Sequence, residues 1–252
     1  MKNNSFIEEY SFIEEVRKVN KLIGRREELQ LLKESMFKKR MKNTILIGNA
    51  GCGKTALLEQ FAYDMKNFFN LVELNIGECL AGTSLRGQFE EKLISFLDEV
   101  SEFNKSTNQK IIIFIDEIHT IYNAGGSDGA VDASNIMKGY LSKGEIIVIG
   151  ATTPEEYNST IKKDKALSRR LSPIFIKDLD DKTNLEILKA FNEGELDDAW
   201  VDYIYEKSKD LNRTNPDIAI EILDRCLAKK KFTGNYIKKQ DIDKIVKYLK
   251  EA

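Results

Sequence analysis

Residues 44–62 read TILIGNAGCGKTALLEQFA, and this stretch decides the fold. Its first four residues are β-branched or aliphatic, which is typical of a buried strand. The segment GNAGCGKT, residues 48–55, follows with the spacing of a P-loop, and helix-forming residues come directly after it. A strand, a phosphate-binding loop and a helix in this order predict an α/β domain with a nucleotide site at the end of the strand.

The P-loop residues explain how a nucleotide would be held. Backbone N–H groups in a glycine-rich turn form a concave anion site, and the N-terminus of the following helix reinforces it. We expect Lys54 to contact the β- and γ-phosphates, the Thr55 hydroxyl to ligate Mg²⁺, and Cys52 to contribute only its backbone amide. The predicted contacts to the nucleotide are Gly48, Asn49, Ala50, Gly51, Cys52, Gly53, Lys54, Thr55 and Ala56.

A second strand, residues 111–115, delivers an acidic pair. Five aliphatic or aromatic residues precede Asp116 and Glu117, so the pair emerges at the carboxyl edge of the sheet, where α/β proteins bind ligands. Asp116 is predicted to hold the magnesium through a water, and Glu117 to orient the water that attacks the γ-phosphate. His119 is the chain's one histidine, and we interpret it as a packed structural residue.

A third strand ends in GATTPEEY, with Thr152 and Thr153 at its carboxyl end. A hydroxyl at this position could bridge the attacking water and the γ-phosphate. The same Thr-Thr-Pro sequence is also ordinary capping chemistry where a strand leads into a helix. The residues alone leave both interpretations open.

Composition excludes several classes of protein. The chain has 39 Lys and Arg against 41 Asp and Glu, so its formal net charge of −2 gives no electrostatic attraction to nucleic acid or anionic lipid. Its longest aliphatic run, residues 111–115, is far too short to cross a bilayer, and the N-terminus lacks the apolar core of a signal peptide. We expect a cytoplasmic protein with no nucleic-acid partner and no membrane association.

The order of the predicted elements indicates two domains and an arm. Strands at residues 44–47, 71–75, 111–115, 146–149 and 174–177 alternate with helices, the pattern of a parallel sheet covered by helices. After about residue 180 only helices are predicted. We therefore predict an α/β nucleotide-binding domain over 20–178 and a helical domain over 179–252. We expect residues 1–19 to form a helical arm, in which Phe6, Tyr10, Ile13 and Val16 could form one apolar stripe.

These motifs together resemble the AAA+ ATPases, specifically the first ATPase ring of the Clp-type protein unfoldases. KLIGRREEL, GNAGCGKT, AGTSLRGQFEEKL, FIDEIHT, DGAVDASNIMK, GATTPEEY, KDKALSRRL and NPDIAIEILD follow that module in order over residues 20–228. The resemblance implies a three-layer α/β/α P-loop core with a five-stranded parallel sheet. It also implies that the helical remainder is the small lid domain over the nucleotide.

The resemblance implies further roles. Thr153 matches the position that reads the γ-phosphate, and Arg169 and Arg170 match the arginines that reach into the neighbouring subunit's site. An arginine there spreads the charge of the transferring phosphoryl group, although cations at a helix C-terminus are also favourable in themselves. The implied adenine contacts are Leu22, Ile23, Ile187 and Pro216.

Arginines that act between subunits imply a homo-oligomeric ring, and the family's rings are hexamers. The loop carrying Leu85 and Arg86 then lines the channel, with residues 125–132 as a second channel loop. The family usually has an aromatic residue at position 85, and leucine offers less area to grip a polypeptide. These 252 residues contain no counterpart of the family's substrate domain, middle domain or second ring.

Three functions remain as hypotheses. The first is a ring ATPase that remodels or unfolds a protein partner through Leu85 and Arg86. The second is a nucleotide-switched assembly or regulatory factor that threads no substrate. The third is a DNA-acting loader, which the near-neutral charge disfavours.

Overall fold

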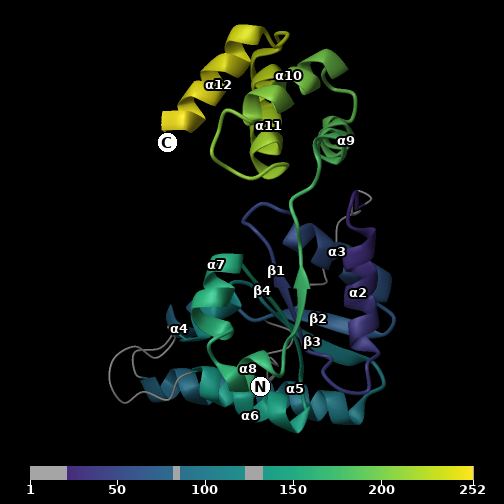
Figure 1. Cartoon of the computed structure of the whole chain (residues 1–252), viewed down its shortest axis with the longest axis vertical. Coiled ribbons are helices and arrows are strands. Elements are labelled where there is room, and N and C mark those ends of the chain that lie inside the picture. Colours follow the sequence, from purple (N-terminus) through teal and green to yellow (C-terminus); the bar gives the residue numbers. More distant parts are fainter. Residues whose placement is uncertain (1–21, 82–85, 123–132, 252) are drawn as a thin grey trace, which may run out of the picture. The chain divides into compact units, whose positions relative to one another are not determined.

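The computed structural model describes residues 22–81, 86–122 and 133–251, and within them the chain divides into two compact units (Figure 1). The first unit comprises Glu27–Gly48 and Ala56–Phe175. The second comprises residues 22–26, Asn49–Thr55 and residues 176–251, so the P-loop groups with the C-terminal helices.

The first unit contains a five-stranded parallel sheet with the strand order β2-β3-β4-β1-β5. The inner strands are almost wholly buried, as expected for a parallel sheet that is covered on both faces. The sheet confirms the predicted α/β fold with five parallel strands. The strands are β1 (Thr44–Ile47), β2 (Phe69–Glu73), β3 (Lys110–Ile115), β4 (Ile147–Thr152) and β5 (Ser172–Phe175).

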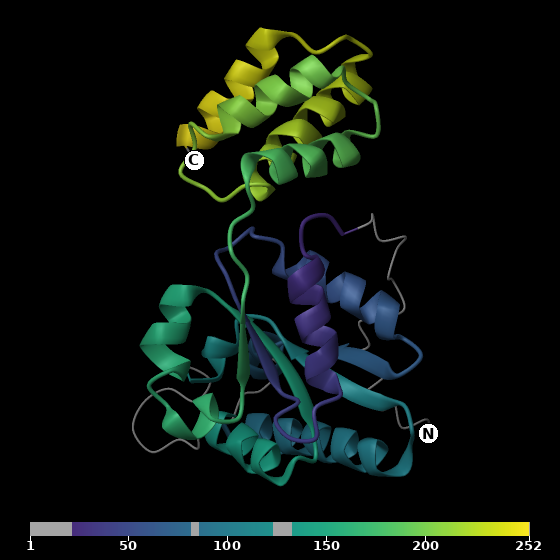
Figure 2. The ribbon, with the colours of Figure 1, turned by 45° about the vertical axis from the view of Figure 1, so that its right-hand side comes forward.

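Helices cover the sheet in two layers. On one face, α5 (Arg86–Ser106) and α6 (Ala133–Lys143) pack onto alternate strand residues in a single buried cluster that includes Leu93 and Ile113. In both views, α2 (Arg26–Met36) and α3 (Lys54–Met65) lie on the other side of the sheet from α5 and α6 (Figures 1 and 2). The result is the three-layer α/β/α core.

The remaining segments of the first unit are short. They are α4 (Ile76–Ala81), the 3₁₀ helix η1 (Ile118–Tyr122), α7 (Pro154–Glu156), the π-helix η2 (Tyr157–Ile161) and α8 (Lys165–Ser168). The segment from Pro154 to Ile161 is not one regular helix, because it changes type after Glu156. The Lys162 amide donates to the Tyr157 carbonyl oxygen, a five-residue spacing that widens the turn into a π-helix.

The second unit holds four helices among its described residues: α9 (Asp181–Asn192), α10 (Asp198–Ser208), α11 (Asp217–Thr233) and α12 (Lys239–Glu251). They share one core, to which Leu188, Ile204, Ile222 and Ile242 contribute, all fully buried. This bundle has the all-helical character predicted for the C-terminal region. Across the described ranges of both units, no helix is long and apolar enough to cross a membrane.

Candidate functional site

Three parallel strands bring the predicted chemistry to one edge of the sheet. In the register of the sheet, Ile47 pairs with Thr152 and Ile115 pairs with Gly150. The residues that follow β1 and β3 therefore leave the sheet on either side of the end of β4. The Gly48 amide also donates to the Thr152 carbonyl oxygen at 3.1 Å. The first P-loop residue, the acidic pair and the threonines thus share the carboxyl edge.

The P-loop has the backbone that a phosphate site requires. Gly51 and Gly53 adopt φ values of +74° and +93°, which residues with a Cβ rarely adopt. The guanidinium of buried Arg25 donates a hydrogen bond to the Cys52 carbonyl oxygen at 2.8 Å and so stabilises the turn. Lys54 begins α3, and its Nζ donates to the Asn49 carbonyl oxygen at 2.9 Å. The ammonium therefore curls back over the loop.

Two acidic side chains of the second unit contact the P-loop. The Asn49 amide donates to both oxygens of Asp178, at 3.1 and 3.3 Å. A Cβ on Gly51 would lie 2.5 Å from the Cβ of Asp217, so glycine is required there for space as well as for its backbone angle. Burial raises the pKa of the Cys52 thiol, although Lys54 and Arg25 act in the opposite direction. The thiol therefore stays protonated at neutral pH.

The acidic pair is presented on a constrained turn. Asp116 and Glu117 are both exposed, and Glu117 has a φ of +48°, which is uncommon for a residue with a side chain. Its amide is held by the Asp116 carboxylate at 2.9 Å, and its carbonyl oxygen accepts from the Thr120 amide at 2.8 Å. Backbone conformations of this kind cost about 1–3 kcal/mol and persist where the surroundings enforce them.

Thr153 is the N-cap of α7 and forms a capping box with Glu156. Its Oγ1 donates to Glu156 Oε2 at 2.7 Å and accepts from the Glu156 amide at 3.3 Å. Burial opposes ionisation of Glu156, but hydrogen bonds from Thr153, the charge of His119 and a hydrogen bond from Thr152 outweigh it and lower the pKa of Glu156. The capping interpretation of the threonines is therefore correct, and it leaves the predicted role of Thr153 open.

The two arginines differ in their surroundings. Both follow α8, where Arg169 is the C-cap. The Arg170 guanidinium donates to the Ala166 carbonyl oxygen, whereas Arg169 is exposed and has no side-chain hydrogen bond or ion pair to another residue within the described ranges. Arg169 is thus the freer of the two to reach another molecule. No described hydrogen bond or ion pair joins either arginine to Asp116 or Glu117.

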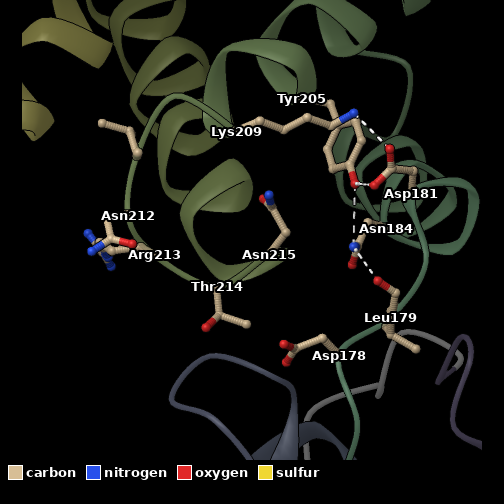
Figure 3. A pocket seen from close by; sticks show the side chains of 11 residues that line it. Asp178, Leu179, Asp181, Asn184, Tyr205, Lys209, Asn212, Arg213, Thr214 and Asn215 are labelled. Atoms are coloured by element: carbon tan, nitrogen blue, oxygen red, sulfur yellow. Dashed lines mark hydrogen bonds and ion pairs between the residues drawn. The ribbon is translucent and has the colours of Figure 1, made fainter.

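The second unit contains an open polar pocket of about 450 Å³ (Figure 3). Tyr205 donates to Asp181 at 2.9 Å, Lys209 pairs with the same carboxylate at 2.8 Å, and Asn184 donates to the Leu179 carbonyl oxygen at 3.1 Å. Asp178, the residue that accepts from Asn49, also lines the pocket. The pocket therefore extends to the residue that holds the P-loop.

The predicted adenine contacts are not part of that lining. Leu22, Ile23 and Ile187 are half-buried, and Pro216 is buried directly before α11. Of the two predicted channel residues, Leu85 lies outside the described residues and Arg86 is the first residue of α5. The second channel loop, residues 125–132, and the predicted arm, residues 1–19, also lie outside them.

The donor set suits Mg²⁺. Thr55 and Asp116 are exposed oxygen donors, and oxygen is the ligand type that magnesium prefers. The described residues contain no group of three or more His, Cys, Asp or Glu side chains that could hold a metal ion. Magnesium in phosphate sites uses one or two protein oxygens together with phosphate oxygens and water, so each of these side chains, taken by itself, is the kind of donor that such a metal uses.

Comparison with known proteins supplies the family. Residues 44–184 match the model of the "ATPase family associated with various cellular activities (AAA)". The chaperone protein ClpB of Aquifex aeolicus (strain VF5) is 38% identical over 253 residues, covering 93% of this chain and 25% of that protein. ClpB of Clostridium perfringens (strain 13 / Type A) is 41% identical over 184 residues, covering 70% and 21%.

Two solved structures are similar to most of this chain. A closed-state structure of Hsp104 with ATPγS and FITC casein has a TM-score of 0.79 and 28% identity, covering 98% of this chain and 45% of that one. The S. cerevisiae Hsp104-ADP complex has a TM-score of 0.70 and 30% identity, covering 82% and 31%. The chain spans about a quarter of the length of the Aquifex relative that it matches.

Proposed function

Because this chain belongs to the AAA family of ATPases, we propose that it binds ATP with Mg²⁺ at the carboxyl edge of its sheet and uses hydrolysis to remodel a protein partner. One observation carries the proposal: the register of β1, β4 and β3 delivers Gly48, Thr153 and the acidic pair to one edge. A P-loop and an acidic pair at the same edge are the two halves of an ATPase site.

Each site residue has a separate role in ATP binding or hydrolysis. The amides of the P-loop and the Lys54 ammonium hold the β- and γ-phosphates. Thr55 and Asp116 hold Mg²⁺, which supplies charge neutralisation at the phosphate oxygens when bound. Glu117 accepts a hydrogen bond from the attacking water, and Thr153 senses the γ-phosphate end of the site. Leu22, Ile23, Ile187 and Pro216 provide the apolar surface for adenine.

Arg169 and Arg170 complete the site from a neighbouring subunit. They lie after α8, and Arg169 in particular has a side chain that is exposed. A head-to-tail contact that closes on itself gives a ring, and a hexamer is the form implied by the family resemblance. Hydrolysis is then efficient only in the assembly.

The protein partner is engaged at Leu85 and Arg86. ClpB is named a chaperone, and the Hsp104 structure contains casein, which supports a polypeptide as the substrate class. Movement of the helical lid domain, residues 179–252, against the nucleotide-binding domain, residues 20–178, would transmit hydrolysis to the loop. Leucine at position 85 gives this grip less contact area than an aromatic residue would.

The test is ATP turnover measured with and without casein as the unfolded polypeptide. We expect casein to raise turnover, Leu85→Asp to abolish the increase, and Leu85→Tyr to enlarge it. If casein and other unfolded chains leave turnover unchanged in the wild type and in Leu85→Tyr, the remodelling role is wrong. Stable rings with negligible hydrolysis would instead support the nucleotide-switched factor.

A further inference from the structure

His119 has both ring nitrogens engaged at the site edge. It lies in η1, two residues after Glu117, and its side chain is 14% exposed. Nδ1 lies 3.2 Å from Thr152 Oγ1, and Nε2 lies 3.3 Å from Glu156 Oε1. The ring therefore bridges the turn after β3 to the end of β4 and the start of α7, a bridge that sequence reasoning did not anticipate.

Glu156 contacts both threonines as well as His119. Its Oε2 accepts hydrogen bonds from Thr153 Oγ1 at 2.7 Å, from the Thr153 amide at 3.1 Å and from Thr152 Oγ1 at 3.2 Å. One carboxylate thus fixes both threonines while its second oxygen faces His119. Charge-assisted hydrogen bonds of this kind are roughly twice as strong as neutral ones.

The turn itself is held by a close approach to β4. Ile118 is buried against Gly150, where an added Cβ would lie 2.6 Å from Ile118 Cδ1. Glu117 keeps its positive φ directly before this anchor. The two residues that follow Glu117 therefore anchor its turn. Ile118 packs against Gly150 of β4, and His119 contacts Glu156.

The network also sets the chemistry of Thr153. A carboxylate only accepts hydrogen bonds, so the Thr153 hydroxyl must donate its proton to Glu156. The oxygen accepts once from the Glu156 amide and keeps one lone pair for a further donor. A water bound between this oxygen and the Glu117 carboxylate would donate one hydrogen to each and keep a lone pair for attack on phosphorus.

We propose that His119 and Glu156 are positioning residues that align Thr153 and Glu117 on the attacking water. This inference rests on the proposed ATP hydrolysis at the same edge. Neither side chain touches the nucleotide in this account; each acts through the residue it holds. Because small displacements of reacting groups cost up to about a hundredfold in rate, loss of the bridge lowers kcat and spares nucleotide binding.

The experiment is steady-state ATP turnover and nucleotide affinity for Glu156→Ala, with Glu155→Ala as the matched control on the same short helix. Glu155 is exposed. We expect Glu156→Ala to lower kcat by about tenfold or more with KM little changed, Glu156→Gln to recover part of the loss, and Glu155→Ala to behave as wild type. His119→Ala should lower kcat in the same direction, and the double variant should be no worse than the stronger single one, since the pair acts as a unit.

Thermal unfolding of each variant separates folding from positioning. If Glu156→Ala does not fold, Glu156→Gln and His119→Gln decide, and unchanged kcat in both overturns the inference. A wild type that hydrolyses ATP while Glu156→Ala matches its kcat also overturns it and leaves the proposed function intact. A wild type with no ATP turnover removes the proposed function itself.

Discussion

The amide of Gly48, the residue after the last pair of β1 and β4, donates a hydrogen bond to the Thr152 carbonyl oxygen at 3.1 Å. The P-loop and the segment that carries Thr153 therefore begin at adjacent points of the sheet. Phosphate binding and the placement of the attacking water depend on the same pair of strands. Substitutions at this edge can therefore be distinguished by whether they alter nucleotide affinity, ATP turnover or the stability of the sheet.

Glu117→Gln tests the water-orienting role. The amide keeps the size of the side chain but removes its capacity to take up a proton, so turnover should fall by about 10²–10⁴-fold while ATP affinity is retained. Phosphate release and nucleotide titration measure the two quantities separately. Glu155→Gln is the matched control, because it removes the charge of an exposed glutamate on α7. Near-normal turnover in Glu117→Gln would remove Glu117 from this role.

Arg169→Ala and Arg170→Ala test whether the site is shared between subunits. In assembled protein the pair should lose up to about 10³-fold in turnover with ATP affinity largely intact. Arg169→Ala alone should have the larger effect, because the Arg170 guanidinium is already bonded to the Ala166 carbonyl oxygen. Lys165→Ala on the same helix should change neither quantity. A monomeric form that hydrolyses ATP as fast as the assembly contradicts the shared site.

Gly150→Ala tests the packing under the acidic pair. The new methyl group would lie 2.6 Å from Ile118 Cδ1, and overpacking of this kind costs about 1–3 kcal/mol of unfolding free energy. Gly139→Ala is the matched control: it lies in α6, where an added Cβ meets nothing within 4 Å apart from its chain neighbours and the backbone of its own helix, and it should raise stability by about 0.5–1 kcal/mol. Denaturant unfolding measures both. Equal stability of the two variants would show that β4 does not hold Ile118 tightly.

The P-loop and its strand could be predicted from sequence because the signal is local. The bounds predicted for β1 are those observed, and a helix does follow the loop, although α3 already begins at Lys54, within the P-loop motif. The strand predicted over residues 71–75 begins two residues earlier, because Phe69 pairs with Lys110 at the start of β3. The start of β2 depends on its pairing with β3, and the hydrophobicity of the β2 segment alone cannot predict that pairing.

The network at Glu156 required the structure. His119 and Glu156 lie far apart in sequence and meet only because β3 and β4 are neighbours. The interpretation of His119 as a packed residue is therefore incomplete, since it bridges two segments of the site. Its capping partner did leave a local signal: Thr153 and Glu156 have the Thr-x-x-Glu spacing of a capping box. The contacts of Asp178 and Asp217 with the P-loop had no such signal.

The central claim is that Lys54 holds the phosphates of a magnesium-bound adenine nucleotide, and calorimetric titration with a slowly hydrolysed ATP analogue in millimolar Mg²⁺ tests it most directly. We predict saturable binding with one site per chain. Lys54→Ala should weaken it by about tenfold or more, because hydrogen bonds to charged groups contribute about 1.5–3 kcal/mol. Lys66→Ala, an exposed lysine just beyond the same helix, should bind as wild type does. No saturable binding by the wild type, or unchanged affinity in Lys54→Ala, would contradict the account.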